Sequence, residues 1–449
     1  MTEFWDFGER RHRADPVVWS KEADESRENA RRMSSLKAVI LVGGAQKGTR
    51  FRPLSLHVPK PLFPVAGLPL IEHHISQLCE LKNVAEIFIL GFYRADEFTE
   101  FIARTRVVYG VSISYLEESG ANGTAGGILQ FKNEILRPVG APREKPAAVF
   151  VLNCDVCGDL PVVEMVGELE RNPTAEALIL TTEAPREESV FYGSVVVDPK
   201  GLVLHYVDKP STFVSTTISC GVYLIRPSVW ERPWERPVNA TIGNGDQSAC
   251  WFETDIFPSM AGNKTLHALS MSDRWWSQVK NPGAALYANR HYLELYRQHA
   301  PERLCSDRAQ IVGDVFIDPT AIVHKTAKIG PNVSIGEHVV IGAGVRVKEA
   351  IILPDCVLED HCCILNSVIG WRSVIGAWAR VEGTPVSPNP NLPFAKLDNK
   401  PLFAVDGRLN PSLTILGPEV NVKREIVVLN SIVMPYKELA TSQMNQIIM

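Results

Sequence analysis

The stretch IVGDVFIDPTAIVHKTAKIGPNVSIGEHVVIGAGVRV, residues 311–347, places an apolar residue at every sixth position. A second apolar series precedes these positions by two residues. The first series is Ile311, Ile317, Val323, Ile329, Ile335, Ile341 and Val347, and the second is Val315, Ala321, Ala327, Val333, Val339 and Val345. A six-residue period of this length is typical of a hexapeptide-repeat β-helix, in which each coil covers the core of its neighbour. The stretch therefore predicts a left-handed parallel β-helix over residues 304–449.

The six-residue pattern continues beyond residue 347 with a shift of phase, and it is interrupted once. The expected core positions are Val357, Cys363, Ile369, Ile375 and Val381, followed after the interruption by Thr414, Leu416, Val420, Val422, Ile426, Val428, Ile432 and Met434. The interruption, residues 384–412, has six prolines and no period, so it is predicted to be a loop inserted into the β-helix. Loops of this length are usually functional or disordered. The apolar residues Phe394, Leu397, Leu402 and Phe403 favour a loop that docks a partner over a merely tolerated insertion.

Residues 36–303 follow a different pattern, in which short apolar runs alternate with helix-period stretches. The strand-like runs are 36–42, 85–93, 111–118, 147–156 and 176–183, and the clearest helical stretch is 70–81. On that helix Ile71, His74, Ile75 and Leu78 share one face. The alternation predicts an α/β, Rossmann-like domain whose mostly parallel sheet is covered by helices on both faces. Ligands of such sheets bind beyond the carboxyl ends of the strands, which is where the loop GGAQKGTR (43–50) is expected.

Composition and charge narrow the function classes. The net charge of −5 gives no electrostatic footprint for nucleic acid or an anionic membrane, and no apolar run approaches the roughly 18 residues that span a bilayer. Residues 1–35 are charged and mixed in sign, and we expect them to form a disordered tail. Nine cysteines without a secretion signal favour a reducing, cytoplasmic location with reduced thiols. The pair Cys154 and Cys157 has no second pair with metal-ligand spacing, which disfavours zinc.

Several motifs, in order along the chain, resemble those of the sugar-nucleotide pyrophosphorylases, which join a sugar 1-phosphate to a nucleoside triphosphate. They are the glycine loop at 43–50, NCDV at 153–156, VDKP at 207–210 and the β-helix. Within that superfamily the chain is similar to GDP-mannose pyrophosphorylase (mannose-1-phosphate guanylyltransferase). The lengthened loop GGAQKGTRFRPL (43–54), FPVAG (63–67) and the NQII ending (445–448) resemble its alpha, or regulatory, subunits.

The resemblance implies roles for the residues at matching positions. Those implied to contact the nucleotide and its phosphates are Gly43, Gly44, Arg50, Lys60, Glu118, Gly123 and Thr124. Those implied to contact the sugar, its phosphate or Mg²⁺ are Asp155, Tyr192, Gly193 and Lys209, with Asp155 as the metal ligand. Catalysis in this family consists mainly of positioning the phosphates and neutralising their charge.

Three departures from the family pattern fall on the metal, the leaving phosphates and the sugar. The loop around Gln46 is two residues longer, Gln278 stands where the family has its second metal-binding aspartate, and Ser219 replaces a sugar-contacting asparagine. An amide is a poor Mg²⁺ ligand but can hydrogen-bond a hydroxyl or a phosphate. Arg50, Lys60 and Lys209 are then relics of a catalytic site. The chain is expected to bind GDP-mannose and to control a catalytic beta subunit in a hetero-oligomer that also self-associates.

Three other interpretations stay open at this stage. The chain could be an active guanylyltransferase whose Mg²⁺ is held by Asp155 and the substrate phosphates alone. It could be a purely structural assembly protein, since nucleotide-exchange subunits of a translation initiation complex share the two-domain plan. A β-helix acyltransferase would need a catalytic histidine, for which His324, His338 and His361 are available.

Overall fold

The computed structural model describes residues 35–44, 49–120, 122–139, 145–232, 249–271, 274–305, 310–384 and 413–449, together with the backbone of Phe4–Trp5. The predicted docking residues Phe394, Leu397, Leu402 and Phe403 lie outside the described residues, as does Gln46. The chain forms two compact units. We call Ser20–Gly44 with His74–Trp276 the sheet unit, and Met1–Trp19, Ala45–His73 and Ser277–Met449 the β-helix unit. Among the described residues, no helix is both long and apolar enough to cross a membrane.

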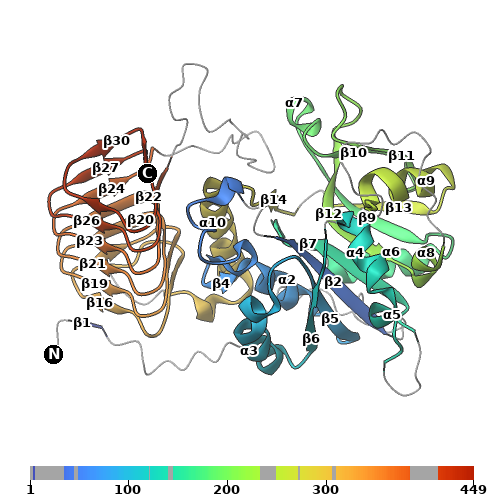
Figure 1. Ribbon diagram of the computed structural model, residues 1–449, viewed down its shortest axis with the longest axis horizontal. Coiled ribbons are helices and arrows are strands. Elements are labelled where there is room, and N and C mark those ends of the chain that lie inside the picture. The colour runs from blue at the N-terminus through green and yellow to red at the C-terminus, as the bar shows by residue number, and fades with distance from the viewer. Residues whose placement is uncertain are drawn as a thin grey trace. The chain divides into compact units, whose positions relative to one another are not determined.

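The sheet unit contains a nine-stranded sheet (Figure 1). Four neighbouring strands are parallel and occur in the order β7 (Ala148–Asn153), β2 (Leu36–Gly43), β5 (Val84–Gly91) and β6 (Ser112–Glu117). The remaining strands, β9 (Ala177–Glu183), β10 (Gly193–Val197), β11 (Val203–Asp208), β12 (Thr217–Ile225) and β13 (Leu266–Ser270), extend the sheet beyond β7. β12 is antiparallel to both β7 and β9, so the sheet is mixed beyond the four parallel strands.

Helices cover both faces of this sheet. Successive residues of a strand point to opposite faces, and on β2 both sets are buried. Val39 belongs to a core cluster with Val149, Val151 and residues of α4, α5, α8 and α9, and its neighbours Ala38 and Ile40, which point to the other face, are also fully buried. This confirms the predicted α/β architecture. The helices are α2 (Leu70–Leu78), α3 (Thr99–Tyr109), α4 (Gly123–Gln130), α5 (Lys132–Ile135), α6 (Val162–Arg171), α7 (Arg186–Ser189), α8 (Pro227–Glu231) and α9 (Phe257–Gly262). A π-helix, Phe252–Ile256, precedes α9.

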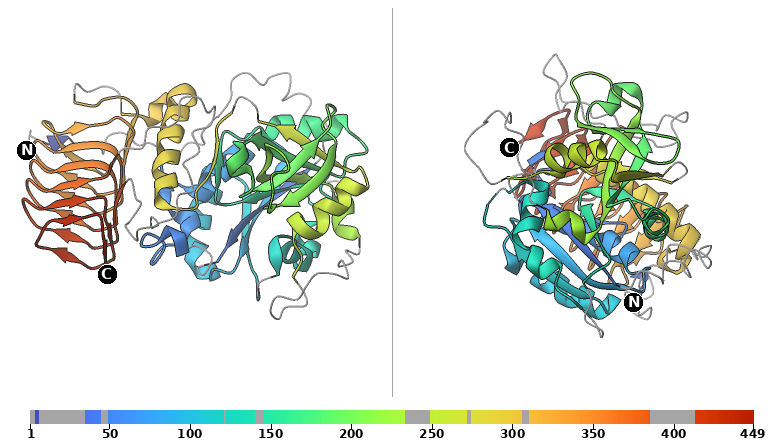
Figure 2. Two further views of the ribbon diagram at one scale, coloured as in Figure 1. Left: turned by 90° about the horizontal axis from the view of Figure 1, so that it is seen from above. Right: turned by 90° about the vertical axis from the view of Figure 1, so that its right-hand side faces the viewer.

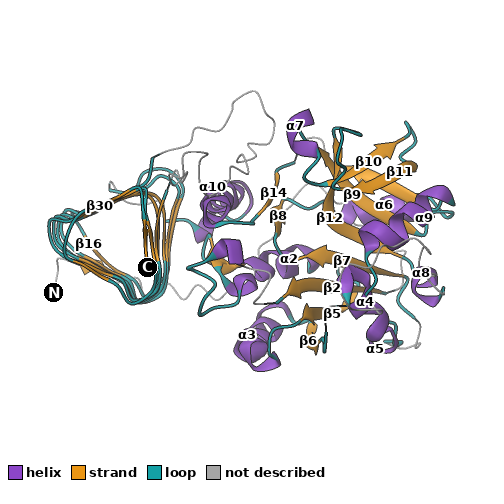
Figure 3. Cartoon of the chain, turned by 45° about the horizontal axis from the view of Figure 1, so that its top comes forward, coloured by secondary structure: helices purple, strands orange, loops and turns teal. Residues whose placement is uncertain are grey.

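The β-helix unit stacks short parallel strands into coils, which confirms a parallel β-helix (Figures 2 and 3). One ladder consists of β16 (Ile322–His324), β19 (Val340–Ile341), β21 (Val357–Leu358), β23 (Val374–Ile375), β26 (Asn421–Val422) and β29 (Glu438–Leu439). The other strands are β15 (Val315–Ile317), β17 (Lys328–Ile329), β18 (Val333–Ile335), β20 (Arg346–Ile352), β22 (Cys363–Ile369), β24 (Arg380–Glu382), β25 (Thr414–Leu416), β27 (Val427–Leu429), β28 (Ile432–Val433), β30 (Gln443–Met444) and β31 (Ile447–Ile448). Within the tail that was expected to be disordered, β1 (Phe4–Trp5) pairs antiparallel with β16.

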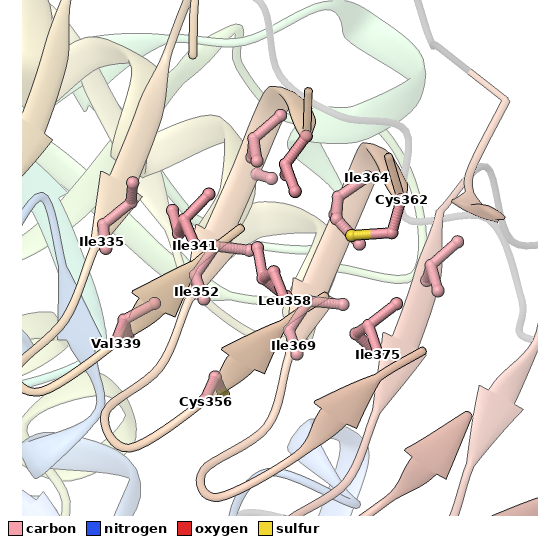
Figure 4. Close-up of a cluster of buried hydrophobic side chains, with 14 of the residues drawn as sticks. Ile335, Val339, Ile341, Ile352, Cys356, Leu358, Cys362, Ile364, Ile369 and Ile375 are labelled. Carbon is pink, nitrogen blue, oxygen red and sulfur yellow. The ribbon is translucent and has the colours of Figure 1, made fainter. Parts of the chain in front are cut away.

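The predicted core positions from 315 to 347 are all buried in the β-helix, and only Ile311 at the start is half-buried (Figure 4). Beyond 347 the predicted phase was wrong at two positions. Leu358 and Ile364 lie in the core, whereas Val357 and Cys363 are half-buried. The prediction shifted the phase by two residues, whereas the coil shortens by only one, because Val347 pairs with Ile364, seventeen residues on, instead of eighteen as in three hexapeptides.

An error of one residue in the opposite direction occurs near the end of the repeat, where Val433 takes the core position predicted for Met434, because Leu416 pairs with Val433, seventeen residues on. Ile426 is half-buried and packs against the core. The other late positions are buried as predicted, namely Ile369, Ile375, Val381, Thr414, Leu416, Val420, Val422, Val428 and Ile432.

The β-helix unit also contains α10 (Pro282–His299) and the segment from 49 to 69. In this segment, η2 (Thr49–Phe51) and η3 (Lys60–Leu62) are 3-10 turns, and β3 (Pro64–Val65) and β4 (Leu68–Pro69) form a hairpin. Asn281 caps α10 by accepting a hydrogen bond from the Ala284 amide at 2.9 Å. α10 packs against β18, β20 and β22.

Candidate functional site

In the sheet unit, the carboxyl ends of the parallel strands bring several predicted site residues to one edge. β2 ends at Gly43, whose carbonyl accepts a hydrogen bond from the Phe92 amide at 2.7 Å. The pair of β5 and β6 ends with a similar bond, in which the Glu118 amide donates to the Gly91 carbonyl at 2.8 Å. Gly43 and Glu118 are therefore fixed by backbone bonds to β5, as the ligand edge of an open α/β sheet requires.

The Glu118 side chain lies over the first turns of α4. A Cβ atom placed on Gly127 would lie 2.3 Å from the Glu118 Oε1 atom, so only glycine at 127 leaves room for the carboxylate. Gly123 begins α4 and Thr124 follows it. The structure thus brings together Glu118, Gly123 and Thr124, the residues that the resemblance assigns to the base and the ribose.

The start of α4 is held by the chain's own backbone. The amides of Ala125 and Gly126 both donate to the Cys250 carbonyl at 3.0 Å, and the Cys250 amide donates to the Asn122 carbonyl at 2.7 Å. Amides at a helix start can bind anions when they are not engaged. Here these two amides already have a partner, so the α4 turn presents side chains to a ligand and not this amide pair.

Asp155 lies in the turn between β7 and β8 (Val156–Gly158), and α2 binds both that turn and the far end of β8. The Cys154 carbonyl accepts a hydrogen bond from His74 Nε2 at 3.3 Å. Gln77 donates from Nε2 to the Gly158 carbonyl at 2.8 Å and accepts from the Leu160 amide at 3.2 Å. Every residue of α2 is buried, whereas only one apolar face was predicted. The polar side chains of His74 and Gln77 can be buried because they bind backbone groups of the sheet unit.

His74 is fully buried, and this burial lowers the pKa of its imidazole to about 4. The ring is therefore neutral at physiological pH, which suits a donor that holds a carbonyl.

Gly193 and Lys209 come together at the start of β10 and the end of β11. Gly193 pairs with Asp208 in the antiparallel register, and the Lys209 amide donates to the Tyr192 carbonyl at 3.1 Å. The Lys209 ammonium lies 3.0 Å from the Asp208 carboxylate. The Lys209 side chain is largely exposed, and its charge lies beside the Asp208 carboxylate.

Ser219 belongs to a buried cluster of hydroxyl groups. Tyr206 and Tyr223 are buried beside it, and this burial raises the pKa of both phenols well above its usual range. The resemblance places Ser219 where related enzymes have a sugar-contacting asparagine. In the structure the Ser219 Oγ atom accepts a hydrogen bond from the Gly221 amide at 3.3 Å.

Glu253 adjoins this cluster and was not singled out from the sequence. Its Oε2 atom accepts a hydrogen bond from the Thr124 hydroxyl at 2.6 Å, and that hydroxyl in turn accepts from the Phe252 amide at 3.0 Å. Burial raises the pKa of the Glu253 carboxyl, against the hydrogen bond from Thr124. The carboxyl thereby fixes the Thr124 hydroxyl at the start of α4. A carboxylate within the apolar run WFETDIF (251–257) was the available sequence signal.

Arg50, Lys60 and Gln278 belong to the β-helix unit. Arg50 is exposed in η2, and Lys60 is half-buried at the start of η3. Gln278 is half-buried at the end of β14 (Trp276–Gln278), three residues before the cap of α10. The roles of these three residues stay predictions.

Comparison with known proteins decides the family. A family model described as "Nucleotidyl transferase" matches residues 37–294, and one described as "GMPPB C-terminal domain" matches residues 311–448. The mannose-1-phosphate guanylyltransferase regulatory subunits alpha-A and alpha-B of Danio rerio are 48% and 47% identical to this chain, over 92% of it and 100% of each relative. The corresponding alpha subunit of Homo sapiens is 46% identical over the same shares. The chain belongs to this family of alpha regulatory subunits.

The side chains of the chain do not form a cluster of metal ligands where the structure describes them. Within the part of the chain that the structure describes, no three His, Cys, Asp or Glu side chains gather as a protein-held metal would require. Asp155 is the one carboxylate that the resemblance assigns to Mg²⁺, and Gln278 offers an amide. These side chains do not make a complete Mg²⁺ site by themselves, so we assign no step to a metal.

All nine cysteines of the chain lie in the described residues, and none of them forms a disulfide there.

Proposed function

We propose that this chain binds GDP-mannose through its sheet unit and regulates a catalytic beta subunit of mannose-1-phosphate guanylyltransferase. The observation that carries the proposal is the pair Asp155 and Gln278. An acid and an amide occupy the positions where the resemblance places two metal-binding acids. An amide cannot supply the negative charge that Mg²⁺ prefers, whereas it can still hydrogen-bond a ligand. The names of the alpha-subunit relatives support a regulatory role.

The geometry of the sheet unit supports binding. Glu118 is fixed by its backbone at the ligand edge of the sheet, and its carboxylate lies beside Gly127 on α4. A carboxylate there accepts hydrogen bonds from the donor groups of a purine base. At the end of β11, Lys209 provides a cation for a phosphate, and the Asp208 carboxylate provides acceptors for sugar hydroxyls.

Regulation requires that GDP-mannose bind two assembly states with different affinities. The β-helix and the proline-rich segment 384–412 are the proposed contacts with the catalytic subunit and with further copies of this chain. A cytoplasmic location is part of the same proposal.

The test is calorimetry of the full chain with GDP-mannose, with GTP and with Mg²⁺, followed by an assay with GTP and mannose 1-phosphate. We expect GDP-mannose to bind and the chain alone to show negligible turnover. The chain should also change the GDP-mannose sensitivity of the catalytic subunit in the mixture. Turnover by the chain alone at the rate of a catalytic subunit would overturn the proposal in favour of an active guanylyltransferase. Absence of GDP-mannose and GTP binding would favour a structural assembly protein.

A further inference from the structure

We infer that the β-helix positions the two predicted phosphate-side cations, Arg50 and Lys60, through a contact between Trp371 and the segment 49–69. The inference rests on the proposed binding of GDP-mannose only for the role of the cations. The contact itself is independent of any ligand. Trp371 thereby acts as a positioning residue and not as a ligand-contacting one.

The contact is a chain of three aromatic rings within the β-helix unit. The rings of Phe51 and Phe63 meet edge to face with centroids 4.9 Å apart. The Phe63 ring meets the Trp371 ring at 6.1 Å with an interplanar angle of 88°. Phe51 and Phe63 are almost fully buried, and edge-to-face pairs at these distances are favourable. Trp371 lies in the turn that follows β22, so a coil of the β-helix forms the base of the chain of rings.

Both cations lie close to Phe51, one in the chain and one in space. Arg50 immediately precedes Phe51 in η2. The Lys60 ammonium lies 5.9 Å from the centroid of the Phe51 ring, and Lys60 begins the 3-10 turn that leads to Phe63. A movement of Phe51 would therefore displace the backbone that carries Arg50 and alter the contact made by the Lys60 ammonium.

Other contacts attach the rest of the segment to the same unit. The Ala66 amide donates to Asn289 Oδ1 at 2.8 Å, and Asn289 donates to the Asn332 carbonyl at 3.4 Å. The hairpin turn meets the β-helix closely, because a Cβ atom on Gly67 would lie 2.3 Å from the Phe316 ring. Further along, the His57 ring lies 5.5 Å from Tyr436 in a late coil.

These contacts separate two groups of predicted ligand-binding residues. The phosphate-side cations belong to the β-helix unit, where Lys60 lies over a ring that a coil supports through Phe63, whereas Gly43, Glu118 and Thr124 belong to the sheet unit. A partner that moves the turn at Trp371 would therefore change the phosphate contacts first. This provides a physical means for a β-helix contact to alter the affinity for a nucleotide sugar.

The test compares Trp371→Leu with Trp378→Leu. Trp378 is a matched control because it is a second tryptophan on a turn of the same β-helix, where it stacks on His361 at 4.4 Å and is 59% exposed. Hydrogen exchange of the full chain without ligand would follow the amides of Arg52, Leu54 and Leu62, which bond within the segment. Calorimetry would follow GDP-mannose, GDP and guanosine, and Trp371→Phe would serve as the conservative variant.

We expect Trp371→Leu to speed exchange of the three amides about tenfold or more, while amides of the β-helix core keep their protection. The affinity for GDP-mannose and GDP should fall about tenfold, and that for guanosine should not change. Trp371→Phe should keep most of the amide protection and most of the affinity of the parent chain, and Trp378→Leu should resemble the parent chain. Equal exchange in the two leucine variants would overturn the inference. Equal losses for guanosine and GDP would also do so, because that result indicates a general loss of structure. If the parent chain binds no nucleotide, the proposed function fails while the exchange result still decides the contact.

Discussion

The Nε2 atom of His74 lies 3.3 Å from the carbonyl oxygen of Cys154, the residue before Asp155. The imidazole must donate here, because a carbonyl oxygen only accepts. Burial lowers the pKa of this imidazole to about 4, so the donor is neutral and does not add charge beside the carboxylate of Asp155. A histidine that the sequence pattern assigned to an apolar helix face thus fixes the turn that carries a predicted site residue.

This relationship predicts a specific loss of stability in acid. The unfolded imidazole takes up a proton near its ordinary pKa of 6.5, whereas the folded one does so only near 4. Between these values the unfolded state binds more protons, so the free energy of unfolding falls as pH decreases from 6.5 to 4, by at most about 3 kcal/mol from His74. His74→Asn should remove this part of the pH dependence in urea unfolding curves.

His291 provides the matched control for that measurement. Burial also lowers the pKa of His291 to about 4. His291→Asn should therefore reduce the same pH dependence while leaving GDP-mannose binding unchanged, whereas His74→Asn should weaken binding as well. An unchanged pH dependence in His74→Asn would contradict the buried neutral imidazole.

The buried carboxyl of Glu253 makes the opposite prediction. Its folded-state pKa is raised by burial, so the folded state favours the protonated form and loses stability as pH rises above the ordinary value of 4.5. Glu253→Gln removes this loss and should increase the free energy of unfolding at pH 8, with little change at pH 4. Unfolding at both pH values checks this, and lower stability of the variant at pH 8 would contradict it.

The close approach of Glu118 to α4 predicts a binding defect without a large folding defect. Gly127→Ala would place a methyl group 2.3 Å from Glu118 Oε1, so the carboxylate must move. We expect the affinity for GDP-mannose to fall about tenfold or more, measured by calorimetry, if Glu118 contacts the base.

Gly167→Ala is the control for this change, because Gly167 also lies within a helix and its added Cβ atom meets nothing within 4 Å. It should leave affinity unchanged and raise stability by up to about 1 kcal/mol. Equal affinities in the two variants would contradict a role for Glu118.

Sequence patterns predicted the fold well because the strands and the repeat depend on local periodicity. The core positions from Val315 to Val347 follow from a six-residue period alone. The pattern failed where the coil shortens by one residue, since Val357 and Leu358 are both apolar and only strand pairing decides which one points inward.

The site was harder to predict because its contacts join distant parts of the chain. Thr124 and Glu253 are 129 residues apart in the sequence, and His74 and Cys154 are 80 apart. No local period links such pairs. The motif residues Gly43, Glu118 and Asp155 could be listed from the resemblance, whereas the polar residues of α2 that hold the Asp155 turn could not.

The coil register makes a prediction that compares two neighbouring residues. Leu358 is 1% exposed in the core, and Val357 is half-buried on the same strand. Leu358→Ala should lower the free energy of unfolding by about 2–5 kcal/mol, because it leaves a cavity in the stack of coils. Val357→Ala should cost about 1 kcal/mol or less. Denaturant unfolding of both variants measures the difference, and similar costs would contradict the register.

The exchange of a carboxylate for an amide at Gln278 predicts how GDP-mannose binding responds to metal. With only Asp155 as an acid, the affinity of the parent chain should change less than about threefold when EDTA removes Mg²⁺. Gln278→Asp restores the second acid, so its affinity should become dependent on Mg²⁺ by about tenfold or more. Gln278→Asn keeps the amide and should behave like the parent chain.

Removing two of the three residues Ala45, Gln46 and Lys47 in addition to Gln278→Asp should then allow measurable turnover of GTP and mannose 1-phosphate. If that double change binds Mg²⁺ but gives no turnover, the loss of catalysis lies elsewhere, with Ser219 as the next position to change.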